Sequence, residues 1–448
     1  MDKTHIDGWE NVLTKLGTSS DRRTHAVPTP APIWTEQSLD DAYADPLIAR
    51  IVDKPADEMT REWVAIHMED EGRAKTITQD LEDLDAQAAL ADGLRWARLH
   101  GGSIAVMGLD DGKDPVEEVS AKGVRAVKYL TVLNRWQVEI EQRQEDPLVK
   151  GYGQPLVYRI RDEGTTTPGA ADRTRDALVH SSRVLRFDGI PTTERRKRQL
   201  GGWHDTVITR VYEAVRDYQQ SWGGVAHLMT ELGQAVIKLD NLASMLAGGQ
   251  DDLVLQRLAY MDTARSIVNA IPLDAQHENW ERKATPITGV PEVLRELGVY
   301  LSAVTDMPAT ILLGISPGGM NATGESDTRH WYDWLRSQQV QRLVPPVGAL
   351  VSHLMQARGY DAKDDWSITP NPLWQPTEKE RSETRKTDAE ADAIHLQWNV
   401  LAPDEVAGSA YSGDRYSSER HYDEERIRRL HEAEMEGEPG DAGVEFED

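Results

Sequence analysis

The sequence predicts an α+β protein, and three patterns support that prediction. Runs between residues 103 and 187 alternate apolar and polar side chains and are rich in β-branched residues, which is typical of strands. Residues 204–232 and 291–304 repeat apolar side chains at steps of three and four, which is typical of amphipathic helices. A third such helix spans 325–355 and has a Pro-Pro pair in its interior.

The composition of the 448-residue chain limits its possible functions. Its length supports a sizeable core, and 39% hydrophobic residues with 13 Trp indicate a folded protein. Zero Cys excludes disulfides, thiolate zinc sites and cysteine nucleophiles, and fits assembly in a reducing cytosol. The net charge of -26 argues against a free-standing DNA binder, because such proteins normally carry a basic surface. Acidity has two remaining interpretations, which are solubility alone and a surface that DNA slides past.

The first half of the chain is predicted to pass from an arm to helices and then to strands. Residues 1–35 hold a short amphipathic piece and a proline-rich end, typical of an extended arm, and show no signal peptide. Residues 39–99 follow a helical pattern. Strands are expected at 103–109, 126–140, 156–161 and 183–187. The basic run 194–198 is interpreted as a solvated loop, with contact to an acidic neighbour or nucleic acid as the alternative.

The middle of the chain is predicted to be a small α/β unit held between two helices. The first helix, 204–232, contains Gly223-Gly224, which a close helix contact or a kink would explain. The second begins at Pro291, a good first-turn residue, and places Val293, Leu297, Leu301 and Val304 on one side. Between them we expect a strand at 235–239, a helix at 251–266 and a strand-rich stretch at 268–283.

Residues 305–355 are the most informative stretch of the sequence and are predicted to form an apolar run, a glycine-rich loop and a long helix. A strand-like apolar run, 309–313, leads into an eleven-residue loop whose glycines allow flexing and close approach to another polymer. The following helix is expected to start with help from Thr323, Glu325 and Asp327 and to bend at Pro345-Pro346, because interior prolines remove backbone donors. Its buried side should comprise Trp331, Leu335, Leu343, Val347, Leu350 and Leu354.

The C-terminal part is predicted to be a crossing, a small helical domain and a tail. Residues 368–380 are proline-rich and should cross between units, and 377–400 with 403–406 should be helical. Residues 431–448 contain eight acids and no Lys or Arg, which predicts disorder. No apolar run approaches the ~20 residues that a membrane-spanning helix needs, so we expect no membrane segment.

Catalytic patterns are weak. Gly314 to Gly318 matches the hydrolase Gly-x-Ser-x-Gly elbow, but the oxyanion donor would be Pro317, which has no N–H. The glycines lack the Gly-Lys-Ser/Thr of a nucleotide loop, although contact with a passing phosphate backbone is compatible. His180 with Ser182 and His204 with Thr206 resemble the His-x-Ser/Thr pairs of some phosphoesterases, and coincidence is the simpler reading. We therefore expect no enzyme activity, no cofactor and no metal.

The segments MPATILLG and SPGGMNATGESD, followed by the amphipathic helix, closely resemble the portal proteins of tailed bacteriophages. Further matching segments lie at 44–63, 94–112 and 180–191, so the resemblance covers roughly residues 40 to 400. It implies a portal fold with a mixed α/β wing, paired stem helices, a small α/β clip, a long kinked helix and a helical crown. The implied parts are a 1–38 arm, 39–203 wing, 204–234 first stem helix, 235–288 clip, 289–305 second stem helix, 306–324 tunnel-loop region, 325–375 kinked helix and wing completion, 376–412 crown and 413–448 acidic tail.

The resemblance also implies a function. The chain would form a homo-oligomeric ring, a dodecamer, at one capsid vertex of a virion, assembled in the host cytoplasm. Double-stranded DNA would pass through without sequence-specific contact, and the partners would be the terminase large subunit, major capsid protein, scaffold and a head-tail adaptor. The tunnel loop facing DNA would comprise Ser316, Pro317, Gly318, Gly319, Met320, Asn321 and Ala322, with Met320 and Asn321 as the contacts and Pro345 and Pro346 as a hinge.

Two alternatives remain open from the sequence. One is a phosphodiesterase directed against host defence nucleotides, which a nuclease assay on variants of His180 and His204 distinguishes. The other is a virion adaptor or monomeric scaffold without a channel, which a mass measurement distinguishes.

Overall fold

The computed structural model describes most of the chain between residues 32 and 398. The described residues are 32–120, 123–149, 151–161, 176–231, 234–239, 256, 259, 278–283, 289–315, 324–361, 365–374, 378–398, 400 and 406. The chain divides into two compact units, Met1–Leu373 and Trp374–Asp448. Helix α13 (Glu378–Gln397) belongs to the second unit and is mostly exposed, and it confirms the predicted helical stretch 377–400.

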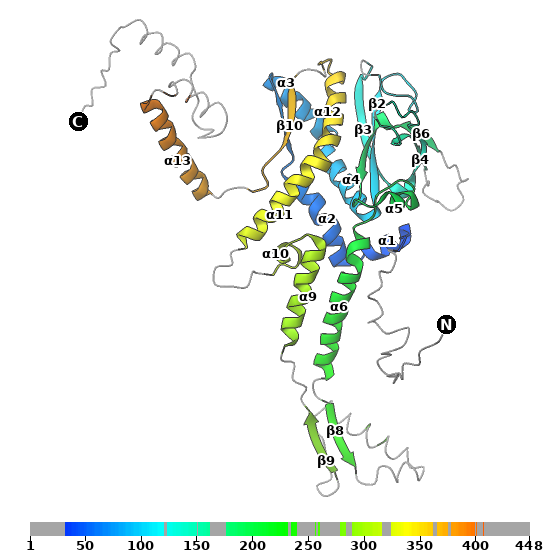
Figure 1. The fold of residues 1–448 in the computed structure, drawn as a ribbon, viewed down its shortest axis with the longest axis vertical. Coiled ribbons are helices and arrows are strands. Elements are labelled where there is room, and N and C mark those ends of the chain that lie inside the picture. Colours follow the sequence, from blue (N-terminus) through cyan, green and yellow to red (C-terminus); the bar gives the residue numbers. More distant parts are fainter. Residues whose placement is uncertain are drawn as a thin grey trace, which may run out of the picture. The chain divides into compact units, whose positions relative to one another are not determined.

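Four helices open the first unit (Figure 1). They are α1 (Glu36–Tyr43), α2 (Pro46–Arg61), α3 (Glu71–Asp83) and α4 (Ala86–His100). Local sequence sets their starts: the Asp45 carboxylate accepts hydrogen bonds from the backbone N–H groups of Leu47 and Ile48, and Pro46 occupies the first turn. The prediction of helices over 39–99 is confirmed except at β1 (Val64–Met68), which interrupts them.

Strand β1 pairs antiparallel with β10 (Trp366–Pro370), with Ile66 opposite Ile368. Strand β10 was not predicted, and its last three residues, 368–370, are the first residues of the predicted crossing 368–380. A five-residue strand whose partner lies some 300 residues away leaves little local pattern. The pairing fastens the end of α2 to the chain that follows the last helix of this unit. Asn371 extends the connection by donating its side-chain amide to the carbonyl of Glu62 (2.7 Å).

Two three-stranded antiparallel sheets form the β part. One has the order β3-β2-β7, from β2 (Gly102–Asp110), β3 (Ala126–Asn134) and β7 (Val184–Asp188); the other has the order β4-β5-β6, from β4 (Val138–Arg143), β5 (Pro155–Ile160) and β6 (Ala177–His180). The four predicted strand runs are confirmed, with a 3-10 turn η2 (Arg135–Gln137) dividing the second run into β3 and β4. The four-residue β6 was missed because it is too short to show alternation.

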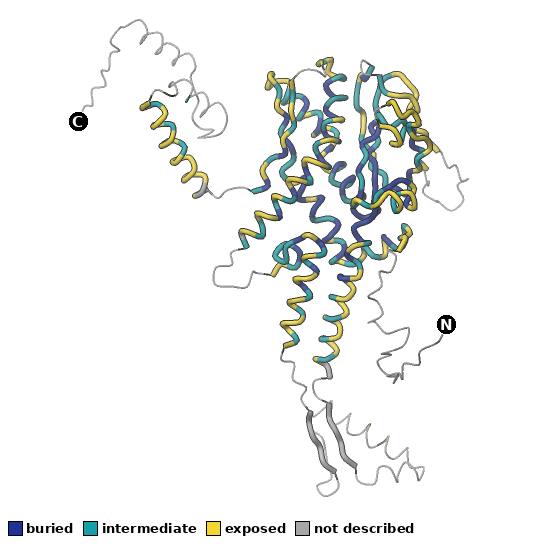
Figure 2. Tube along the Cα trace, viewed as in Figure 1, coloured by how far each residue is buried: buried dark blue, intermediate teal, exposed yellow. Residues whose placement is uncertain are grey.

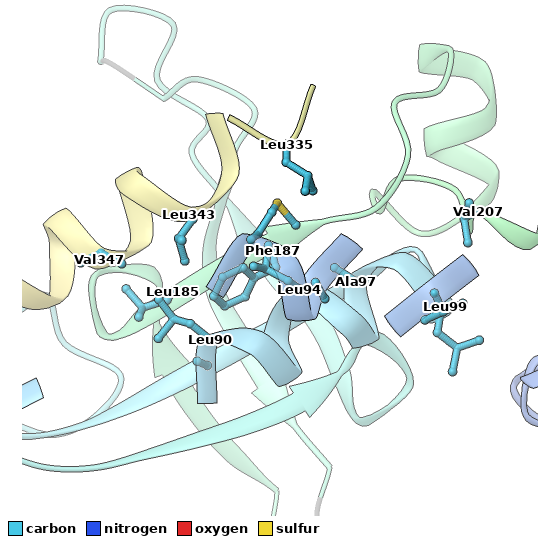
Figure 3. Close-up of a cluster of buried hydrophobic side chains, with 14 of the residues drawn as sticks. Leu90, Leu94, Ala97, Leu99, Leu185, Phe187, Val207, Leu335, Leu343 and Val347 are labelled. Carbon is cyan, nitrogen blue, oxygen red and sulfur yellow. The ribbon is translucent and has the colours of Figure 1, made fainter. Parts of the chain in front are cut away.

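Successive side chains of β2 belong to two different cores, because they point to opposite faces of the sheet. Ala105 and Met107 join the large core beneath α4, whereas Ile104 packs into a smaller core between the two sheets. The smaller core contains Ile104, Val138, Tyr158, Val179, Val184 and Trp203. In the large core the Phe187 ring lies near Leu94 and Leu185 (Figure 3). It is so close to Gly93 that a Cβ at that position would be 2.7 Å from the ring. The buried stretches of α2, α4 and β2 are dark blue in Figure 2.

The next elements are α5 (Glu194–Gln199), α6 (Ile208–Glu231), β8 (Gln234–Leu239), β9 (Glu278–Lys283) and α9 (Val290–Thr305). The basic run 194–198 is a helix and not the predicted loop, because Thr193 caps it and Arg196 forms an ion pair with Asp205. Strand β8, the strand part of 268–283 and the second helix are confirmed. The first helix begins at Ile208 and not at His204, since Asp205 forms a β-bridge with Ile190. The helix predicted at 251–266 lies outside the described residues except for 256 and 259, which are helical.

The described helices between residues 309 and 357 are four in number. They are α10 (Ala309–Leu312), α11 (Glu325–Gln338), a π-helical segment η4 (Gln339–Leu343) and α12 (Val344–Ala357). The strand predicted at 309–313 was wrong: Pro308 starts a helical turn in which its carbonyl accepts from the N–H groups of Ile311 and Leu312. A short apolar run fits a strand or a buried helical turn equally well, so its pattern could not decide.

The long helix has an irregular turn directly before the predicted bend at Pro345-Pro346. The irregular turn is the π-helical segment, and Pro345 and Pro346 follow it in the first turn of α12. A wider turn relieves the clash between a proline ring and the preceding carbonyls, so the irregularity precedes the prolines that cause it. The predicted buried side is confirmed at all six positions, from Trp331 to Leu354.

Candidate functional site

Asp205 fixes the first turn of α6 to the residues around it. Its carboxylate accepts hydrogen bonds from the Thr206 backbone N–H (2.9 Å), the Thr209 hydroxyl (2.8 Å) and Arg196 Nε (3.0 Å). The Thr209 hydroxyl in turn accepts from the Trp34 indole N–H (3.1 Å). A carboxylate at a helix N-terminus also complements the helix dipole, so this end of α6 is held rigidly.

Arg98 on α4 connects that turn to α2. Its guanidinium, 7% exposed, donates to the backbone carbonyls of Ile51 (2.8 Å) and Val52 (3.1 Å). Its own backbone carbonyl accepts from the Val207 N–H (3.0 Å) and the Thr206 hydroxyl. Burial lowers the pKa of Arg98 to about 10, so the side chain stays charged at neutral pH. One residue therefore joins α2, α4 and the start of α6.

Helices α6 and α9 lie side by side below this junction (Figure 1). Gly298 of α9 leaves room for Leu313, whose side chain would lie 3.1 Å from a Cβ at this position, whereas Tyr218 of α6 would lie at an ordinary contact distance of 3.8 Å. Near the junction the pair is buried, with Val211 and Leu301 inaccessible. Farther along α6 the side chains become exposed, as Figure 2 shows, and Trp222 is 50% exposed.

Two predictions about these helices need correction or refinement. Val293 is 61% exposed and does not share the buried side of α9 with Leu301. Gly223 and Gly224 have no described atom within 4 Å of where a Cβ would stand, so no helix within this described part packs against them.

The predicted tunnel loop has firmly anchored roots. On one side Met307 and Leu312 are buried, and the Arg50 guanidinium donates to the Ile311 carbonyl (2.7 Å). Gly314 and Gly324, at the two ends, adopt left-handed φ values of +68° and +69°, a conformation that favours glycine. The loop residues themselves, Ser316, Pro317, Gly318, Gly319, Met320, Asn321 and Ala322, lie outside the described residues.

Helix α11 begins at Glu325, so Glu325 and Asp327 stand in its first turn as predicted, but the capping differs from the prediction. Its N-cap is Gly324, and no side chain caps the helix there. Thr323, predicted to help, lies outside the described residues. Gly324 adopts a left-handed conformation and directs the backbone into the helix. The acidic residues of the first turn do not indicate this conformation in the sequence.

The π-helical segment next to the predicted hinge is tied to two other elements. The buried side-chain amide of Gln339 donates to the Met59 carbonyl of α2 (2.7 Å). Arg342 Nη1 lies 3.2 Å from the carbonyl oxygens of both Asp188 and Gly189, at the end of β7. Burial lowers the pKa of Arg342. Any change of angle at this segment would therefore be transmitted to α2 and to the sheet; Pro345 and Pro346 remain a predicted hinge.

The two histidine pairs serve local structure. His180 Nδ1 lies 2.9 Å from the Ser182 hydroxyl, which also accepts from the Val119 backbone N–H. The Thr206 hydroxyl donates to the Arg98 carbonyl, and burial lowers the pKa of His204. Within the described residues no cluster of three or more His, Asp or Glu side chains is arranged to hold a metal ion. No helix in the described part is long and apolar enough to span a membrane.

A family model for phage portal proteins matches residues 37–394. The chain belongs to the phage portal protein family. This match spans most of the chain, including α6, α9, the loop roots and the kinked helix. The resemblance inferred from the sequence is confirmed at the level of the family.

Three relatives are similar along most of this portal-family chain. Two are named "Anti-CBASS protein Acb1": that of Caulobacter sp. strain RHG1 is 31% identical over 404 residues, and that of Sphingomonas paeninsulae is 28% identical over 421 residues. The alignments cover 86% and 92% of this chain, but only 62% and 65% of those proteins. An uncharacterized protein of Haemophilus influenzae is 23% identical over 432 residues, covering 95% of this chain and 94% of that protein.

Solved structures resemble the chain weakly. One is the neck of a native gene transfer agent (GTA) particle computed with C12 symmetry, with 12% identity and a TM-score of 0.46 over 85% of this chain and 95% of that one. Another is an HK97-family phage portal protein from Corynebacterium diphtheriae, with 12% identity and a TM-score of 0.40 over 77% and 100% of the two chains. These scores are too low to support a conclusion, so membership in the family rests on the family match.

The sequence did not indicate that Arg98 and Asp205 hold the first turn of α6. Both residues lay within stretches that were predicted to be helical, where a charged side chain is normally exposed. A charged residue on an otherwise apolar helix face, as at Arg98 between Leu94 and Leu99, is the one signal that could have indicated a buried polar junction.

His100, two residues beyond Arg98, makes the stability of this junction depend on pH. It is buried, and burial together with the nearby Arg135 charge lowers its pKa from 6.5 to about 4. The folded state therefore favours neutral His100, so stability is complete above pH 6.5 and declines as the pH falls from 6.5 towards 4. Between pH 7 and 4.5 the titration of His100 should lower the free energy of unfolding by about 2–3 kcal/mol. We expect this loss to be absent in His100→Gln, as measured by urea unfolding at both pH values.

The matched control is His67→Gln, on the exposed side of β1. This variant should follow the pH profile of the unmodified protein. Identical profiles for His100→Gln and the unmodified protein would contradict the assignment of this acid sensitivity to His100.

Proposed function

We propose that the chain assembles into a closed ring at one vertex of a phage capsid, and that double-stranded DNA enters and leaves through the ring. Membership in the portal family supports this proposal. The ring would have twelve copies and act without catalysis or cofactor. Its partners would be the terminase large subunit during packaging, major capsid protein and scaffold during assembly, and a head-tail adaptor afterwards, with the finished ring in the virion.

The observation that carries the proposal is the exposed apolar surface on α6 and α9. Trp222 and Met229 of α6, with Val293, Val299 and Tyr300 of α9, are half exposed or more. A set of large apolar side chains on two neighbouring helices is typical of a surface that another protein covers. Gly223 and Gly224 add an open stretch of backbone where a helix could approach closely. A second copy of the same pair is the partner that a ring supplies.

The parts of the fold take the following proposed roles. The wing would be 39–203, the stem helices 204–234 and 289–305, the clip 235–288, the kinked helix and wing completion 325–375 and the crown 376–412. Stem helices would line the channel, and the clip would offer the docking surface for the packaging motor. The junction at Arg98 would hold the stem at a fixed angle to the wing.

The proposed channel surface would let DNA pass because it attracts phosphate weakly. Helix α6 carries two Arg and three acids, and α9 carries one Arg and two acids, so neither presents a basic stripe. The loop 316–322 has no charged residue. Met320 and Asn321 would contact the duplex through an apolar side chain and a neutral amide, which gives weak contact independent of base sequence.

The proposed role of the chain does not include a phosphodiesterase activity. The two relatives named "Anti-CBASS protein Acb1" extend well beyond the aligned part, since the chain spans 62% and 65% of their length. Ser182 and Thr206, the hydroxyl members of the two histidine pairs, already make hydrogen bonds to backbone groups.

The assembly can be tested by mass. Twelve copies of the 50.2 kDa chain would give a particle of about 600 kDa by light scattering or native mass spectrometry. Trp222→Asp combined with Val293→Asp should shift the population to small species, because it buries unpaired charge in the contact between copies. Tyr152→Asp, at the exposed β4–β5 connection, is the control and should leave the large particle intact. A monomer under all conditions would refute the ring.

The loop can be tested in assembled particles. Replacing Gly318 and Gly319 by Val should leave rings intact but reduce DNA retention in filled heads, because β-branched residues remove the backbone freedom that glycine provides. Ala322→Val adds similar bulk within the loop while keeping both glycines, and should retain DNA normally. Packaged genome length and yield unchanged by the double substitution would count against a DNA-facing role for the loop.

A further inference from the structure

A pocket of about 400 Å³ lies on the wing, apart from the α6–α9 pair and the loop roots. It opens between the turn η2 with strand β4 and the chain that follows α5. Its walls include Arg135, Trp136, Ile140, Leu200 and Trp203, with Arg161 among the lining residues. This volume lies in the range of pockets that hold small molecules. The wall is about half apolar, and its polar part comes from Arg135, Glu139, Arg161 and Gln199.

Two lining residues have buried donors without a partner. Arg135 is 7% exposed, and its Nη1 makes no hydrogen bond to any described residue. The indole N–H of the neighbouring Trp136 is likewise buried and unpaired within the described part. The Arg135 guanidinium stacks over the Trp136 ring at 4.3 Å, which supports its position but leaves its N–H groups free.

Other buried arginines of the same fold are satisfied. Arg98 is as deeply buried as Arg135 and donates to two backbone carbonyls. Arg183, 3% exposed, is paired with the Asp111 carboxylate at 2.7 Å. A buried donor without an acceptor costs free energy, and more so when it carries a charge, so Arg135 is exceptional among them.

Asp205 does not accept a hydrogen bond from Arg135. The Asp205 carboxylate acts on Arg135 only through space, since its hydrogen bonds go to Arg196, Thr206 and Thr209. Arg161, also on the pocket wall, is already paired with Glu139 at 2.6 Å. Among the described residues, the Nη1 of Arg135 and the indole N–H of Trp136 therefore remain without a partner. One guanidinium and one neutral donor suit a single negative charge better than a doubly charged phosphate.

We propose that this pocket binds a carboxylate attached to an apolar or aromatic body. The carboxylate would accept from Arg135 and from the Trp136 indole, while the body packs against Ile140 and Trp203. Two sources supply this chemistry: a free organic acid, or the C-terminal carboxylate of a peptide that ends in an aromatic residue. The site would be a binding function of the wing that is separate from the passage of DNA.

Calorimetric titration of the full chain tests the proposal with charged and neutral forms of the same probe. 3-Phenylpropionate should bind at least ~10-fold more tightly than 3-phenylpropionamide, because hydrogen bonds to a charged group are the stronger ones. The tripeptide Gly-Gly-Phe and its C-terminal amide form the second arm. Binding of the tripeptide alone would assign the site to a protein terminus, and binding of the small acid would assign it to a free metabolite.

Variants separate the site from general structure. Arg135→Met should abolish the preference for the acid while keeping or raising the thermal unfolding temperature, because it removes an unpaired buried charge. Arg161→Met is the control and should change affinity less than ~3-fold, since its partner is Glu139. Trp136→Phe, which keeps a ring but loses the N–H, should weaken the acid and serves if Arg135→Met does not fold. Equal binding of acid and amide, no binding of either acid, or full acid binding by the variants would overturn the proposal.

Discussion

The fold depends on the buried guanidinium of Arg98. A positive charge inside a protein must be satisfied by acceptors, and here the backbone carbonyls of Ile51 and Val52 in α2 supply them. Because the Arg98 backbone also accepts from Val207 and Thr206, the position of α2 determines the position of the first turn of α6. A long helix that leaves the core gains its direction from this junction, since its own exposed half contributes little packing.

The same logic extends to the second half of the chain. Gln339 and Arg342 fasten the π-helical segment to α2 and to the end of β7, and Arg50 of α2 fastens the turn before the loop. Helix α2 thus contacts Arg98 beside the start of α6, the turn before the predicted loop, and the π-helical segment. In the proposed ring, this arrangement would let a movement of the loop reach the wing through a few buried polar contacts rather than through flexible connections.

Periodic elements could be predicted from the sequence and non-local ones could not. Local periodicity of apolar residues predicts an element from one sequence alone. Apolar residues recur at every second position in the strands β2, β5 and β7, and at every third or fourth position in α9, α11 and α12. The β1–β10 pair, the left-handed Gly324 cap and the position of the π-helical turn depend on contacts between distant segments. The family was recognisable from the loop segment, whereas Arg98, Asp205 and the unpaired Arg135 required the three-dimensional arrangement.

The most direct test of the central claim is a cryo-electron microscopy map of the purified assembly viewed along its axis. The account predicts a closed ring of copies around a hole wide enough for a DNA duplex, about 20 Å, with α6 and α9 of every copy lining it and Trp222 covered by a neighbour. A particle without a central hole, or a ring in which α6 and α9 face away from the axis with Trp222 exposed, would contradict it.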